Sequence, residues 1–197
     1  MEGAAFILIG AALFSHSWYL MGVYPEGRTM GMYVGGFGLA VLIALVFAPM
    51  LLTGMDDAGK EITSRSGRVL ADPVTEVMIL KTLIVLWSAY AIGVAANGLW
   101  EFDDRAIGFY GGFLSVATLV GFIYYVSQLQ SPYGEAIWLG MAGATLILSV
   151  LAGLVFFYLA IPFNALRLVT AWVMVIGSIA VAAIGLAMLT TAIEFVS

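Results

Sequence analysis

The 197-residue sequence contains no cysteine and only one histidine. The absence of cysteine excludes disulfides, thiolate catalysis and iron–sulfur ligation. Zinc, copper and di-iron sites normally use several imidazoles or a cluster of carboxylates, so one histidine gives no basis for a metal site. The GxGxxG, Walker and GxSxG motifs are also missing, and these are the usual signs of nucleotide binding or hydrolase chemistry. We therefore expect no metal, no cofactor and no enzymatic activity.

Charged residues are scarce as well, at 10% of the chain, whereas 63% is hydrophobic and the mean hydropathy is +1.08. Soluble domains do not have this composition. The apolar residues form six runs, each long enough for the ~20 residues that a helix needs to cross a bilayer. The runs cover 3–24, 31–54, 77–99, 106–128, 135–161 and 168–195. They lack the period of two that marks a membrane β-barrel. The sequence predicts an all-α polytopic membrane protein with six transmembrane helices, the first of which is a retained span and not a removable signal peptide.

The connections between these runs are mostly tight turns, so neighbouring helices must be antiparallel. The short turns are marked by Pro25, by Glu101 to Arg105, by Ser131 to Gly134 and by Pro162 to Asn164. The remaining connection, 55–76, is a polar loop of mixed charge without a basic stripe for nucleic acid. We expect one transmembrane domain over 1–197, built from hairpins 1–54, 77–128 and 135–197. Its expected surroundings are membrane lipids.

A short pattern occurs three times: an arginine, a small residue three positions later and an aromatic residue five positions later. The copies are Arg28-Gly31-Tyr33, Arg105-Gly108-Tyr110 and Arg167-Thr170-Trp172. In the first two copies, Gly35-Gly36-Phe37 corresponds to Gly111-Gly112-Phe113 with a one-residue slip. The pattern predicts one supersecondary unit used three times, with a path down the middle. Three equivalent arginines beside tight turns favour a cytoplasmic location for those turns, with both termini outside.

His16 lies near the middle of the first span, between Ser15 and Ser17. An ionisable residue at that depth usually faces the bundle interior or a wet path. Two interpretations stay open. The imidazole is neutral and hydrogen-bonds a neighbouring helix, with the serines bonded to carbonyls one turn earlier, or it lines a pore.

The stretch from Asn97 to Phe113 resembles the segment that joins helices 3 and 4 in the urea/amide channel family of UreI/AmiS type. In that family, too, an Asn near the helix end precedes an Asp-x-Arg and an aromatic pair. Further similarities lie at Ile9-Gly10-Ala11, Gly22, Pro25, Tyr33 to Gly36, Ile161-Pro162 and Thr170-x-Trp172, so the resemblance covers essentially the full length. It implies three two-helix hairpins around a narrow protomer pore, a ring hexamer in a prokaryotic inner membrane, and passive passage of urea or short-chain amides.

A small neutral solute must shed water, so the wall of such a pore needs a few donors and acceptors between apolar constrictions. The expected lining residues are His16, Trp87, Tyr90, Asn97 and Trp172. The chain also departs from the family pattern at several positions. The resemblance puts Leu146 and Val150 where the family has constricting tryptophans, Gly177 for a membrane glutamate, His16 for Asn or Asp, and Gly31 for Asn. We therefore expect that the narrow aromatic gate is absent.

Two other functional classes stay open. The first is a non-transporting accessory subunit of a larger membrane complex, which would dock through glycine-rich faces at Gly31/Gly35 and Gly108/Gly112. The second is a proton-linked carrier in which His16 titrates together with Glu194 or Glu135. Such a carrier needs a second protonatable group at mid-membrane depth.

Overall fold

The computed structural model describes residues 2–23, 26–53, 73–129, 136–161 and 163–194. Within these ranges the secondary structure is entirely helical. The elements are α1 (Glu2–Leu20), α2 (Gly27–Thr53), α3 (Pro73–Trp100), α4 (Asp104–Leu129), α5 (Ala136–Val155), the π turn η1 (Phe156–Ala160), the 3-10 turn η2 (Asn164–Leu166) and α6 (Arg167–Glu194). All six α-helices are long and apolar enough to cross a membrane. The predicted polytopic helical membrane protein is thus confirmed.

The helix boundaries follow local sequence signals. α1 is followed by Gly22, whose φ of +80° favours glycine. α3 begins at Pro73, earlier than the predicted position 77, because proline is well tolerated at the first position of a helix. The fifth span was predicted as one helix, but its last turn is the π turn η1. There the ring of Phe156 packs against Gly112 of α4.

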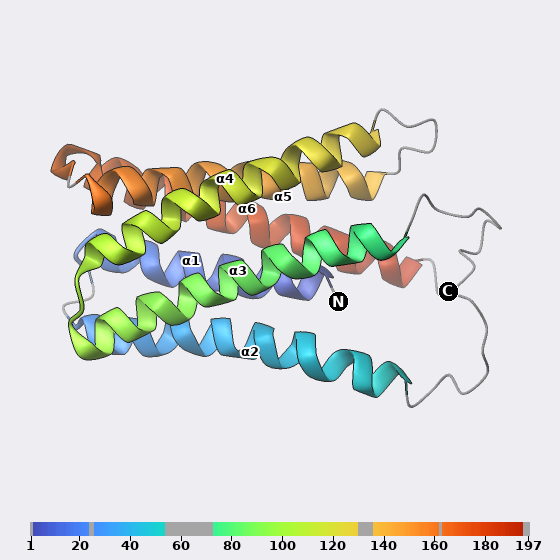
Figure 1. The fold of residues 1–197 in the computed structure, drawn as a ribbon, viewed down its shortest axis with the longest axis horizontal. Coiled ribbons are helices and arrows are strands. Elements are labelled where there is room, and N and C mark those ends of the chain that lie inside the picture. The colour runs from blue at the N-terminus through green and yellow to red at the C-terminus, as the bar shows by residue number, and fades with distance from the viewer. Residues whose placement is uncertain (1, 24–25, 54–72, 130–135, 162, 195–197) are drawn as a thin grey trace.

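The six helices run antiparallel to their chain neighbours, and α2, α4 and α6 all start at the same end of the bundle (Figure 1). Arg28, Arg105 and Arg167 lie in the first turns of these three helices. We call this end of the molecule the arginine end. α1 begins and α6 finishes at the opposite end (Figure 1).

The closest packing joins α2 with α3, α4 with α5, and α6 with α1. Small residues allow each of these close approaches. A methyl group built on Gly31 would lie 3.0 Å from the carbonyl oxygen of Ala95, and one on Gly10 would lie 2.7 Å from that of Ser178. At Gly108 the methyl group would overlap the backbone of Ala160. The same packing device therefore serves all three pairs.

The glycine-rich faces on α2 and α4 are occupied within the chain itself. Gly31 and Gly35 face Ala95 of α3, and Gly108 and Gly112 face residues 156–160 of η1. These faces were the sequence feature that favoured a docking role in a larger complex. They are not free surfaces in this fold.

The one-residue slip between the first two repeats changes which way an aromatic ring points. One residue corresponds to about 100° of rotation around an α-helix. Accordingly, Phe37 of α2 packs against the buried core, whereas Phe113 of α4 is 58% exposed. Both repeats pack small residues against a neighbouring helical element, but only the first turns its phenylalanine toward the interior.

Several hydroxyl groups within the spans donate hydrogen bonds to backbone carbonyls. Ser15 donates to the carbonyl of Ala11 at 3.0 Å and Ser17 to that of Phe14 at 2.6 Å, which confirms the prediction for these serines. Between α4 and α5, Ser115 and Ser149 each donate to the other's backbone carbonyl at 2.8 Å. This reciprocal pair joins two helices without leaving an unsatisfied hydroxyl in the membrane interior.

Candidate functional site

His16 of α1 and Tyr90 of α3 meet inside the bundle. The Tyr90 hydroxyl lies 3.3 Å from Nδ1 of His16, and the two residues are 4% and 3% exposed. Trp87 stands one turn before Tyr90, and the two ring centroids are 5.6 Å apart in an edge-to-face arrangement. Residues three positions apart share a helix face, so α3 turns both rings toward α1. Three of the five predicted lining residues are therefore brought together.

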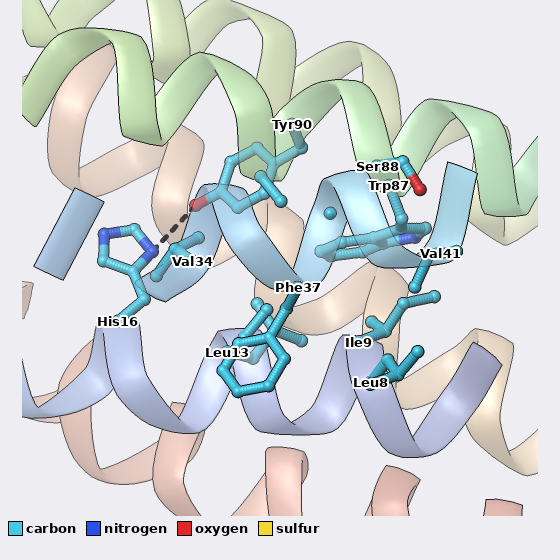
Figure 2. A pocket seen from close by; sticks show the side chains of 13 residues that line it. Leu8, Ile9, Leu13, His16, Val34, Phe37, Val41, Trp87, Ser88 and Tyr90 are labelled. Atoms are coloured by element: carbon cyan, nitrogen blue, oxygen red, sulfur yellow. Dashed lines mark hydrogen bonds between the residues drawn. The ribbon is translucent and has the colours of Figure 1, made fainter. Parts of the chain in front are cut away.

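These three side chains belong to the wall of a small internal cavity between α1, α2 and α3, which we call the inner cavity (Figure 2). It is lined by Leu8, Ile9, Ala12, Leu13, His16, Val34, Phe37, Gly38, Val41, Trp87, Ser88, Tyr90 and Ala91. Its volume of about 10 Å³ is close to the minimum for one water molecule. The indole N–H of Trp87 and the hydroxyl of Ser88 are buried without a hydrogen-bond partner among the described residues. Unpartnered groups of this kind can bind a water molecule or a polar solute.

A larger cavity of about 380 Å³ lies at the arginine end, and we call it the vestibule. It is lined by His16, Tyr19, Leu20, Gly22, Met30, Val94, Asn97, Gly98, Asp104, Ile107, Tyr158, Leu159 and Arg167, so all six spans contribute to it. Because His16 lines both cavities, it stands at the boundary between the vestibule and the inner cavity.

Asn97, the fourth predicted residue, lies in the vestibule wall. Its amide nitrogen donates to the carboxylate of Asp104. Its carbonyl oxygen Oδ1 is buried and has no hydrogen-bond partner among the described residues. Asn97 is seven positions after Tyr90, which is about two helical turns, so the two residues share one face of α3.

A third cavity, also of about 10 Å³, lies on the other side of Trp87, and we call it the distal cavity. It is lined by Phe6, Ile9, Leu80, Leu83, Ile84, Trp87, Thr118, Thr145 and Leu148. Ile9 and Trp87 line both this cavity and the inner one. The vestibule, the inner cavity and the distal cavity thus follow one another into the bundle, interrupted first at His16 and then at Ile9 and Trp87.

Trp172, the fifth predicted residue, is set apart from the others. Its side chain is 55% exposed on α6, and it lines none of the three cavities. Leu146 and Val150 of α5 are also exposed, by 41% and 50%, because Thr145 and Leu148 are the α5 residues that face the distal cavity. Leu146 and Val150, which the resemblance put at the positions of the family's constricting tryptophans, line none of the three cavities. The aromatic side chains of Trp87 and Tyr90 border the inner cavity instead. Gly177 packs against Leu151 of α5.

The sequence did not indicate that Asp104 and Arg167 line the vestibule together with Asn97. It placed Asp104 in a turn and Arg167 in a repeat. Nε of Arg167 donates to the backbone carbonyl of Leu20 at 2.8 Å, which caps the end of α1. By contrast, Arg28 pairs with Glu101 at 3.5 Å, and both side chains are exposed. Equivalent repeat positions therefore serve different local purposes.

The described residues contain no group of three or more His, Asp or Glu side chains that could hold a metal ion. No protein-family profile and no curated protein matches the sequence. A solved structure, the urea channel from the human gastric pathogen Helicobacter pylori, is similar with a TM-score of 0.65. The match covers 92% of this chain and 93% of that chain at 18% sequence identity. This likeness confirms the resemblance at the level of the fold, which is of the urea-channel type.

Proposed function

We propose that this protein is a passive membrane channel for small neutral solutes such as urea or short-chain amides. The observation that carries the proposal is the succession of vestibule, inner cavity and distal cavity inside a six-helix membrane bundle. Polar groups occur at intervals along it, at Asn97, at the His16–Tyr90 pair and at the indole N–H of Trp87. A neutral solute that gives up its water needs such groups between apolar segments. The fold shared with the Helicobacter pylori urea channel supports the same function.

The inner cavity and the distal cavity suit a solute that carries no net charge. In the described residues, the walls of the inner and distal cavities include no carboxylate, lysine or arginine. An ion entering them would lose its hydration without compensation, at a large cost in free energy. The free-energy cost of dehydrating a neutral amide is far smaller. Glu135 and the side chain of Glu194, the partners considered for a proton-linked carrier, lie outside the described residues.

The alternative of a non-transporting accessory subunit loses its main support, because the glycine-rich faces are used between α2 and α3 and between α4 and η1. For the channel we propose a homo-oligomeric ring, hexameric by resemblance, in a prokaryotic inner membrane. The arginine end faces the cytoplasm in this arrangement. Exposed aromatic residues such as Trp172 are then placed against lipid or a neighbouring protomer.

Stopped-flow light scattering on proteoliposomes tests the proposal with urea, acetamide and glycerol. We expect uptake of urea and acetamide faster than into empty liposomes, and a changed rate in His16→Leu. Ser15→Leu is the matched control, since Ser15 immediately precedes His16 on α1, bonds its own helix and lines none of the three cavities. Uptake no faster than through lipid alone would overturn the channel function. An equal effect of both substitutions would remove His16 from the path.

A further inference from the structure

We infer that the vestibule is a binding site for one primary amide or urea, with the solute's N–H groups held by Asn97 and Asp104 and its carbonyl oxygen held by Arg167. The inference rests on the proposed channel function and assigns its solute selection to the arginine end. It places this selection before the solute reaches His16.

The acceptor side of the site is fixed by the bond between Asn97 and Asp104. An asparagine amide can turn over to exchange its oxygen and nitrogen, but only the nitrogen can donate to a carboxylate. Because Nδ2 donates to Asp104, Oδ1 is left as the free end, and it is buried without a partner among the described residues. A carbonyl oxygen only accepts hydrogen bonds. The group that satisfies Oδ1 must therefore be a donor, and the carboxylate of Asp104 offers further acceptor positions beside it.

The donor side is the guanidinium group of Arg167. A guanidinium carries five N–H donors, and Nε is committed to the carbonyl of Leu20. The side chain of Arg167 makes no other hydrogen bond or ion pair with the described residues, so its terminal nitrogens remain available to a ligand in the vestibule. They lie beside Gly22, where an added methyl group would be 3.6 Å from Nη2. The lack of a side chain at position 22 keeps this approach open.

A ligand that satisfies both sides must combine N–H donors and a strong carbonyl acceptor in one small neutral molecule. Urea and primary amides have this combination. Glycerol has hydroxyl groups but no carbonyl oxygen for the guanidinium. The opposite charges of Asp104 and Arg167 leave no net attraction for a simple cation or anion, whereas they favour a solute with a large dipole.

His16 supplies the next polar contact. Nδ1 is engaged with Tyr90, and the second ring nitrogen lies on the side of the imidazole away from Tyr90 (Figure 2). That nitrogen has no hydrogen-bond partner among the described residues, and His16 borders the vestibule. A solute released from Asn97 therefore meets a polar group before it enters the apolar inner cavity.

Saturation-transfer-difference NMR on the full chain in lipid nanodiscs tests this site independently of transport. Irradiation of aromatic protons avoids the lipid and saturates Tyr19, Tyr158 and His16, which line the vestibule. The probes are the methyl protons of acetamide, the carbon-bound protons of glycerol and the methylene protons of the zwitterion glycine. The samples are the wild-type protein, Asn97→Leu and empty nanodiscs. Asn164→Leu is the matched control, because Asn164 is exposed and does not line the vestibule.

We expect a wild-type signal for acetamide that is clearly above those of glycerol and glycine. It should be about fivefold weaker in Asn97→Leu, the effect of roughly one lost hydrogen bond, and unchanged in Asn164→Leu. If Asn97→Leu is not monodisperse, Asn97→Ala removes the same oxygen without added bulk. Equal acetamide signals in the wild type and the Asn97 variants would overturn the site, as would a preference for glycerol or glycine. Acetamide binding at Asn97 without proteoliposome uptake would instead overturn the channel function and leave the site standing.

Discussion

The hydroxyl of Tyr90 and Nδ1 of His16 lie 3.3 Å apart and join α3 to α1 at the boundary between the vestibule and the inner cavity. These two helices have few other close approaches, since α1 packs mainly on α6 and α3 mainly on α2. The bond is therefore both a link between two tight helix pairs and a polar element of the proposed path.

The first prediction concerns that link. Tyr90→Phe removes the hydroxyl and leaves Nδ1 of His16 buried without its partner, so we expect a loss of about 1 kcal/mol in the free energy of unfolding. Thermal unfolding in detergent, followed by size-exclusion chromatography, measures it. Tyr33→Phe is the control, because Tyr33 is 63% exposed and should be neutral. A Tyr90→Phe protein as stable as the wild type would show that the bond contributes nothing to the fold.

The second prediction compares two glycines of the repeat helices. Gly108→Ala should destabilise the protein by about 1–3 kcal/mol, because the new methyl group overlaps the backbone of Ala160 and forces α4 and η1 apart. Gly36→Ala should be neutral or stabilising by up to about 1 kcal/mol, since Gly36 has nothing within 4 Å of the added methyl group and alanine favours the helix. Thermal unfolding of both variants checks the sign of each effect. Equal stabilities would show that Gly108 does not set the distance between these helices.

The apolar runs predicted six helices, and the repeat predicted that three of them begin alike, because the spacing of arginine, small residue and aromatic residue is a local property of each helix start. It could not predict that the small residues pack α2 on α3, α4 on α5 and α6 on α1. A small residue specifies that some backbone comes close, but not which one. The partners Ala95, Ala160 and Ser178 are known only once the helices are assembled.

The third prediction separates two arginines of the repeat. Arg167→Gln removes the Nε donor from the carbonyl of Leu20 and should cost about 1–2 kcal/mol, because a helix end in a partly buried setting loses its charged cap. Arg28→Gln should cost no more than about 0.5 kcal/mol, because its ion pair with Glu101 is exposed. Thermal unfolding curves of the two variants provide the comparison. A larger loss for Arg28→Gln would reverse this assignment.

The polar residues that line the cavities could be predicted from the sequence. The aromatic and apolar ones could not be distinguished in the same way from residues on the outer surface of the bundle. His16 and Asn97 stand out because polar groups are rare in a span, and both line cavities. Trp172 and Trp87 are of the same type, yet one is 55% exposed and the other 3% exposed. Lipid tails are as apolar as leucine, so a membrane helix has no hydrophobic stripe that would separate its outer face from its inner face. Leu146 and Val150 were placed by the resemblance, counted back from Ile161-Pro162, and a count along the sequence does not specify which face of the helix is exposed.

The last prediction concerns Trp87, whose side chain lies between the inner cavity and the distal cavity and lines both. Trp87→Ala removes the ring between them, so amides longer than acetamide, such as butyramide, should enter proteoliposomes faster than with the wild type. The substitution should also cost about 3–5 kcal/mol of stability, because it leaves a cavity in the core, so the protein must first be shown to be monodisperse. Trp100→Ala is the control on the same helix, since Trp100 is 65% exposed and should change neither rate nor stability appreciably. Because widening a true constriction must relax selection by size, an unchanged butyramide rate in a folded Trp87→Ala protein would mean that solutes do not pass between α1 and α3 at this point.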